Sequence, residues 1–149
     1  MRRLPPLLRR AWYSLNQAFR QQIAHLGITP DQYSILRWLA ESPPEGLTQS
    51  ELTEVMASDP NTIAATVRRM EIAGLVTRPP HETDRRAKRV KLEASGLKIF
   101  KEAQGLALEL QDSVFQEMPQ KEAALFLELL EKVADACSRL PSGNRQSQN

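Results

Sequence analysis

The chain has few of the residue types on which many protein chemistries depend. Its 149 residues include one cysteine, two histidines and only 5% aromatic residues. A single cysteine excludes an intramolecular disulfide framework and is typical of a reducing cytoplasm. Cysteine and histidine are the usual ligands of structural zinc, so we expect neither a zinc site nor any other metal or cofactor.

Long apolar runs and catalytic motifs are also missing. No apolar run approaches the roughly 20 residues that a membrane-spanning helix needs. The first ten residues are arginine-rich, and their apolar stretch is too short for a signal peptide. The sequence contains no nucleophile–base set, phosphate-binding loop or carboxylate pair. We therefore expect a cytoplasmic protein that neither enters a membrane nor acts as an enzyme.

Charge, in contrast, is strongly segregated along the chain. The net charge is only +2, but residues 58–92 hold eight basic and four acidic residues, a local excess of +4. The length and an apolar fraction of 41% fit one domain spanning 1–149. The positive block coincides with a helix-and-hairpin pattern, and this coincidence indicates a partner such as double-stranded DNA.

The spacing of apolar residues predicts helices on both sides of this block. Apolar residues recur every three or four positions from Leu8 to Leu26, which predicts a helix that ends near Gly27. Thr29 and Pro30 begin a second helix, which stops before a loop over 42–46. Two further helical patterns lie within 94–140, followed by a polar tail over 141–149 that we expect to be disordered.

Two short helices and a hairpin are predicted in the centre. Thr48 and Glu51 form a capping-box pattern for a helix that extends to Met56. Ser58 or Asp59 caps the next helix, which ends near Gly74. Residues 75–78 and 87–92 favour strands. The predicted fold class is mainly α with a small β-wing, a winged helix-turn-helix over 30–92 flanked by long helices.

The second helix of this pair is the predicted recognition helix. If Ile63 faces the core, Val67 and Met70 face it too, and Asn61, Ala65 and Arg68 face outward. Thr62, Thr66 and Arg69 then lie on one flank. Asparagine can make paired hydrogen bonds to adenine, and small alanines allow close approach to thymine methyl groups. The DNA-binding candidates on this helix are Ser58, Asn61, Thr62, Ala65, Arg68 and Arg69. Ser58 and Thr62 are equally what any helix start requires.

The hairpin carries the remaining candidates. We expect Asp84 to cap the turn and to orient Arg85 or Arg86 through a charge-assisted hydrogen bond, so that one arginine enters a narrow minor groove. Lys88 and Arg89 are interpreted as phosphate anchors. The alternative is an ordinary charged hairpin.

In these features the chain resembles the MarR family of winged-helix transcription regulators. The resemblance covers residues 8–139 and rests on motifs such as the segment from Arg69 to Val76 and the segment from Thr83 to Lys88. It implies a homodimer, formed by helices within 1–27 and 94–140, that binds a palindromic operator, usually as a repressor. It also implies, for many members, release by a small phenolic or aromatic ligand. The cap of the helix that follows the wing is expected to be weaker than in the family or to be shifted to Ser95.

Three further expectations concern ligands, redox chemistry and partners. Trp12, Phe19, His25 and Tyr33 could line an effector pocket between the first two helices, or they are ordinary core residues. Cys137 is expected to be an inert core residue, so redox sensing is disfavoured. The alternative function is a winged-helix module that binds a protein partner and not DNA.

Overall fold

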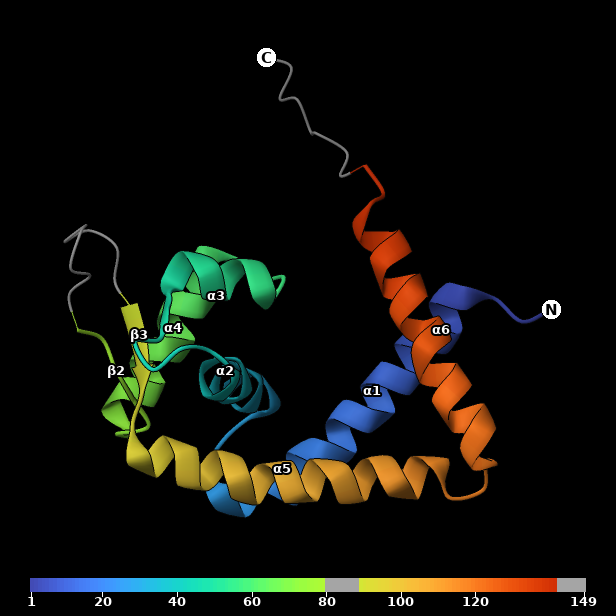
Figure 1. Cartoon of the computed structure of the whole chain (residues 1–149), viewed down its shortest axis with the longest axis horizontal. Coiled ribbons are helices and arrows are strands. Elements are labelled where there is room, and N and C mark those ends of the chain that lie inside the picture. Colours follow the sequence, from blue (N-terminus) through green and yellow to red (C-terminus); the bar gives the residue numbers. More distant parts are fainter. Residues whose placement is uncertain (80–88, 142–149) are drawn as a thin grey trace. The chain divides into compact units, whose positions relative to one another are not determined.

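The computed structural model describes residues 1–79 and 89–141 (Figure 1). The chain divides into two compact units, Met1–Leu110 and a smaller unit that begins at Gln111. We describe each unit by itself. Within the described ranges, no helix has the length and apolar character needed to cross a membrane.

The first unit begins with two helices whose ends follow the predicted signals. Helix α1 (Leu4–Ile23) continues into the 3-10 turn η1 (Ala24–Leu26), and Gly27 then takes a left-handed conformation at φ 72°. Helix α2 (Pro30–Glu41) starts with a capping box. The Thr29 side chain accepts a hydrogen bond from the Gln32 amide, and the Gln32 side chain accepts one from the Thr29 amide. These reciprocal bonds satisfy amides that a helix start leaves without partners.

The helix-turn-helix follows, as the sequence predicts. Helix α3 (Gln49–Val55) is capped by the Thr48–Glu51 box, and α4 (Pro60–Ile72) is capped by Asp59. Between them, Ala57 has a positive φ of 48°, which an L-residue adopts only at an energetic cost. This turn packs α3 against α4 in one layer.

The wing is a small antiparallel sheet with the strand order β1–β3–β2. Strand β2 (Val76–Thr77) is shorter than the predicted 75–78. Strand β3 (Arg89–Leu92) ends at the predicted residue, and residues 80–88, which include the start of the predicted strand 87–92, lie outside the described part. Strand β1 (Leu47–Thr48) was not predicted, because two residues carry no periodic signal. Strand β1 pairs with β3, and Leu47 lies opposite Val90.

One hydrophobic core joins these elements. It lies where α2, α3 and α4 meet the inner face of the sheet, and Phe100 and Ala103 of α5 (Ala94–Phe115) extend it. The largest fully buried side chains are Ile23, Ile35, Leu36, Leu52, Ile63, Met70, Val67, Val76 and Val90. The predicted inward face of the recognition helix, Ile63, Val67 and Met70, is confirmed.

Helix α5 starts directly against the turn between α4 and β2. The Glu93 amide donates to the Leu75 carbonyl at 3.0 Å, and a Cβ placed on Gly96 would lie 2.2 Å from the same oxygen. Of the two expectations for this helix start, a cap shifted to Ser95 was wrong, because α5 already begins at Ala94. The Ser95 hydroxyl donates to the Gly74 carbonyl, so it ties α5 to the end of α4.

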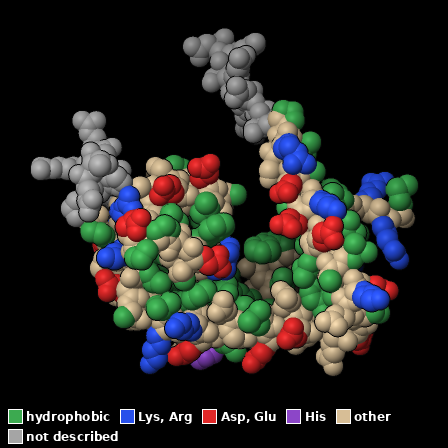
Figure 2. Space-filling model, in the orientation of Figure 1, with side chains coloured by type: hydrophobic (Ala, Val, Ile, Leu, Met, Phe, Trp, Pro, Cys, Tyr) green, Lys and Arg blue, Asp and Glu red, His purple; other side chains and the backbone are tan. Residues whose placement is uncertain are grey.

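The second unit holds the end of α5 and helix α6 (Gln120–Ser138), in which Phe115 and Phe126 make an edge contact at 5.9 Å. No residue of α6 is buried in the single chain. Figure 2 shows hydrophobic side chains gathered on its surface. Cys137 is exposed, so the expectation that it lies in the core was wrong for the single chain, because the apolar face of α6 is uncovered.

Candidate nucleic-acid interface

The outer face of α4 presents the residues that the helical period placed there. Asn61, Ala65, Arg68 and Arg69 are all exposed. Thr66, expected on the flank, is buried at 8% exposure, and its hydroxyl donates to the Thr62 carbonyl. The burial follows from its position one residue before Val67, at the edge of the core-facing stripe. The outer face therefore carries small and polar side chains near the start of α4 and cationic side chains nearer its end.

Asp59 fixes the start of this helix. One of its carboxylate oxygens accepts from the Thr62 amide at 2.9 Å, and the other accepts from the Thr62 hydroxyl. These hydrogen bonds from the side chain and the amide of Thr62 lower the pKa of Asp59. Ser58 precedes the cap and is exposed, and its amide donates to the Thr53 carbonyl at 3.1 Å. Asp59 is thus the cap, and Thr62 is oriented by it.

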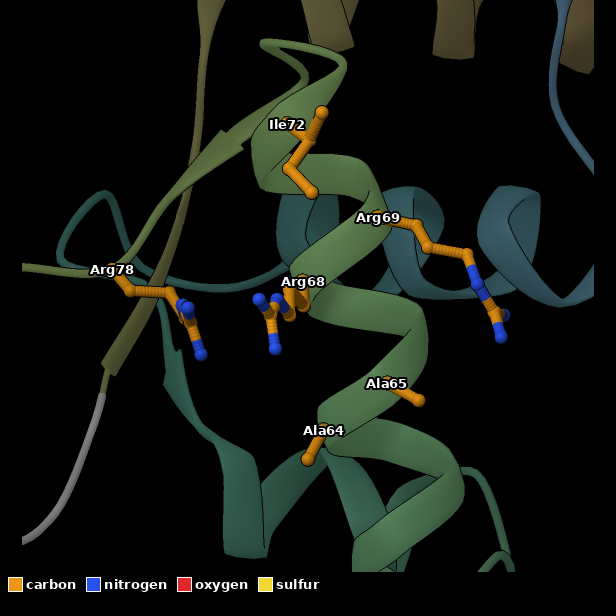
Figure 3. Close-up of a pocket in the computed structure, with 6 residues that line it drawn as sticks. All are labelled: Ala64, Ala65, Arg68, Arg69, Ile72 and Arg78. Carbon is orange, nitrogen blue, oxygen red and sulfur yellow. The ribbon is translucent and has the colours of Figure 1, made fainter.

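An open hollow of about 560 Å³ lies between α4 and the segment just after β2 (Figure 3). Figure 3 shows Arg68 and Arg78 extending on the same side of α4, whereas Arg69 extends on the other side. Because the alanines are small, a ligand can approach the helix backbone closely between the guanidinium groups. The lining residues are Ala64, Ala65, Arg68, Arg69, Ile72 and Arg78.

Arg78 is held in place by a two-pronged ion pair. Its Nε donates to Glu71 Oε2 at 2.9 Å, and its Nη2 donates to Glu71 Oε1 at 2.8 Å. These hydrogen bonds raise the pKa of Arg78 above its already high value. Such a parallel pair fixes the plane of the guanidinium as well as its position. Among the described residues, by contrast, no carboxylate forms an ion pair with Arg68 or Arg69.

Side chains alternate between the two faces of the sheet along the described part of β3. Val90 is buried and Leu92 half-buried on one face, and Lys91 is exposed on the other. Arg89 Nη1 donates to the carbonyl of Gly46 at 3.4 Å, so this predicted phosphate anchor also holds the loop before β1. The predicted residues Asp84, Arg85, Arg86 and Lys88 lie outside the described part of the chain.

The four candidate effector residues do not form one cluster. Phe19 and Tyr33 pack edge to face at 4.9 Å, and Tyr33 stacks on Phe100 at 5.8 Å. Burial raises the pKa of the Tyr33 hydroxyl. Trp12 is 65% exposed and His25 is exposed. Phe19 and Tyr33 are therefore core-edge residues in this conformation.

Comparison with known proteins agrees with this geometry. Residues 26–87 match the model of the MarR family. Over 139 residues the chain is 33% identical to the transcriptional regulator HosA of Escherichia coli O111:H-, covering 87% of this chain and 98% of HosA. The chain belongs to the MarR family. As a MarR-family member it is a DNA-binding transcriptional regulator and not an enzyme, as the sequence predicts.

Solved structures show the same fold. The DNA complex of Staphylococcus aureus MepR superposes with a TM-score of 0.83 at 21% identity, covering 91% of this chain and 99% of MepR. Bordetella bronchiseptica BpsR superposes with a TM-score of 0.81 at 24% identity, covering 89% of this chain and 94% of BpsR. The predicted mainly α fold with a small wing, a MarR-like winged helix-turn-helix, is confirmed.

Arg78 lines the hollow, although the sequence did not indicate a place for it there. It is one of the eight basic residues over 58–92, but nothing in the sequence distinguished it from the others. Its pairing with Glu71 spans a helix end, a turn and a strand, so no helical or strand period relates the two positions. A glutamate near the end of a helix and an arginine just after the next strand could have been noticed as a pair.

Proposed function

We propose that this MarR-family regulator binds a pseudo-palindromic operator as a homodimer and represses transcription. The observation that carries the proposal is the outer face of α4, where Asn61, Arg68 and Arg69 are exposed around a hollow lined by alanines. A helix with this face fits the major groove, where asparagine and arginine distinguish base pairs.

Each candidate residue has a proposed role. Asn61 and Ala65 face base edges, and Thr62 contacts a base or phosphate in the orientation that Asp59 gives it. Ser58, Arg68 and Arg69 contact the phosphate backbone near the two ends of α4. On the wing, Asp84 orients Arg86 or its neighbour Arg85 in the minor groove, and Lys88 and Arg89 bind phosphates.

The dimer is proposed to form through the helices of 1–27 and 94–140. Leu125, Phe126 and Leu129 of α6 are each 46–51% exposed in the single chain, and Trp12 of α1 is 65% exposed. Large apolar side chains so exposed on a soluble domain indicate a contact surface. A two-fold dimer places two recognition helices about one helical turn of DNA apart, and this spacing supplies specificity that one helix lacks.

We also propose that a small aromatic or phenolic ligand releases the operator. Phe19, Tyr33, Trp12 and His25 remain the candidate residues. The solved structure of BpsR concerns regulation of its DNA binding by 6-hydroxynicotinic acid, which is such a molecule. Binding between α1 and α2 would require the Phe19–Tyr33 contact to open, so the ligand is expected to change the environment of Trp12 or Tyr33 and their fluorescence.

The decisive experiment is selection of bound fragments from a random duplex pool, followed by gel-shift titration of the selected operator. We expect a single palindromic motif, an affinity that falls steeply with salt, and a large loss for Arg86→Ala. A protein that elutes at the mass of one chain would contradict the dimer. If no duplex is bound at any salt concentration, the alternative of a protein-binding winged helix replaces this proposal.

A further inference from the structure

In the proposed complex, the hollow beside α4 lies between the major groove and the adjacent minor groove. The proposed function places α4 in the major groove and the wing in the adjacent minor groove. A sugar–phosphate strand always runs between two adjacent grooves, so it passes between the outer face of α4 and the base of the wing. The inference below rests on that proposed function.

The described residues at this place suit a phosphate strand. The hollow is lined by arginines 68, 69 and 78, with Ala64 and Ala65 between them, and none of its described lining residues is acidic. Figure 3 shows the side chains of Arg68 and Arg78 extending on the same side of the helix, from two different elements. Two guanidinium groups that converge from a helix and a strand end can hold one phosphodiester between them.

We propose that Arg78 is a phosphate-binding residue and that Arg68 and Arg78 together hold the phosphodiester strand between the two grooves. Glu71 is the positioning residue, because its carboxylate occupies Nε and Nη2 of Arg78 at 2.9 and 2.8 Å. In the described part of the chain, no hydrogen bond uses Nη1 of Arg78. A fixed guanidinium loses less side-chain entropy when it binds a phosphate than a free one does.

A phosphate contact has a signature that base contacts lack. It weakens binding by a similar factor on every sequence, and it lowers the dependence of log K on log salt by about 1 for each lost contact. For a dimer, Arg78→Ala should therefore reduce the slope by about 2. It should also reduce affinity roughly tenfold or more, on the selected operator and on random duplex alike.

Arg37→Ala is the matched control. Arg37 is also an ion-paired arginine, bound to Glu41 at 3.1 Å on α2, and it does not line the hollow. Its removal should leave the salt slope unchanged. Arg78→Gln removes the charge but keeps an amide that can donate to Glu71, so it should lower the slope as Arg78→Ala does, and it tests the inference if Arg78→Ala unfolds. Thermal melts of each variant identify such unfolding.

The outcomes separate the inference from the function on which it rests. If the wild-type chain shows no salt-dependent affinity for any duplex, the proposed function fails. If the wild-type chain binds and folded Arg78→Ala keeps the wild-type slope, Arg78 is not a phosphate ligand and the inference is overturned. A loss confined to the selected operator, with unchanged slope, would also overturn it, because that pattern belongs to base contacts.

Discussion

Two glycines in the same helix should respond in opposite ways to the same substitution. Gly96 and Gly105 both lie in α5, and neither has a positive φ. A Cβ on Gly105 would meet nothing within 4 Å, whereas a Cβ on Gly96 would lie 2.2 Å from the Leu75 carbonyl oxygen and 2.9 Å from Leu92 Cδ1. We expect Gly105→Ala to stabilise the protein and Gly96→Ala to destabilise it.

The magnitudes follow from the geometry. Alanine is favoured over glycine within a helix by about 1 kcal/mol, which applies at both positions. At Gly96 the contact falls short of the ordinary 3.4 Å by 3.4 − 2.2 = 1.2 Å. The neighbouring atom is backbone, so α5 must move away from the α4–β2 turn. Overpacking of this kind costs about 1–3 kcal/mol, and weakening the bond from Glu93 to Leu75 adds about 1 kcal/mol. The expected net loss is about 2 kcal/mol.

Thermal unfolding at one fixed protein concentration checks both variants. For a chain of this size about 1 kcal/mol shifts Tm by about 2–4 °C, so Gly96→Ala should melt about 4–8 °C below the wild type and Gly105→Ala about 2–4 °C above it. The concentration must be the same because the proposed dimerisation would make Tm concentration-dependent. If Gly96→Ala melts at or above the wild-type temperature, the close packing of α5 on the turn does not limit stability and the reasoning is refuted.

Three further predictions concern the turn, the cap and the ion pair. Ala57→Gly removes the strain of a positive φ, but it also raises the conformational entropy of the unfolded chain. Urea unfolding should therefore show a free energy of unfolding that is higher by about 0.5 kcal/mol. Because its pKa is lowered from 3.8 in the folded state, Asp59 stabilises the protein above that pH, and this contribution is lost as the pH falls through the folded-state pKa. Asp59→Asn should therefore flatten the acid limb of Tm against pH, and an unchanged limb would contradict this assignment. A double-mutant cycle on Glu71 and Arg78, whose side chains are 37% and 20% exposed, should give a coupling of about 0.5–1 kcal/mol that shrinks in about 1 M salt. A coupling indistinguishable from zero in low salt would exclude a structural role for the pair.

The sequence predicted those parts of the fold that depend on neighbouring residues. The N-cap at Thr29, the capping box at Thr48 and the inward stripe through Ile63 are local patterns, and the structure has all three. The two-residue strand β1 depends on pairing with a segment more than 40 positions away. No local pattern indicates it.

In the candidate site, too, the sequence predicted the features set by local patterns and not those set by tertiary packing. The outward face of α4 follows from helical period alone, so Asn61 and Arg68 were predicted correctly as exposed residues. The pairing of Glu71 with Arg78 and the hollow beside it depend on the angle between a helix and a strand. Packing of the whole core sets that angle. The alternative that Ser95 caps α5 failed for the same reason, because only the folded chain brings the Gly74 carbonyl to its hydroxyl.

Strand β3 ends at Leu92 and helix α5 begins at Ala94, so a single residue, Glu93, joins them. Its amide is bound to Leu75, and β3 is hydrogen-bonded to a strand on each side. Such a joint has no slack in which a hinge could form. We therefore expect a rotation of the first turns of α5 to move β3 and the end of α4 together with it.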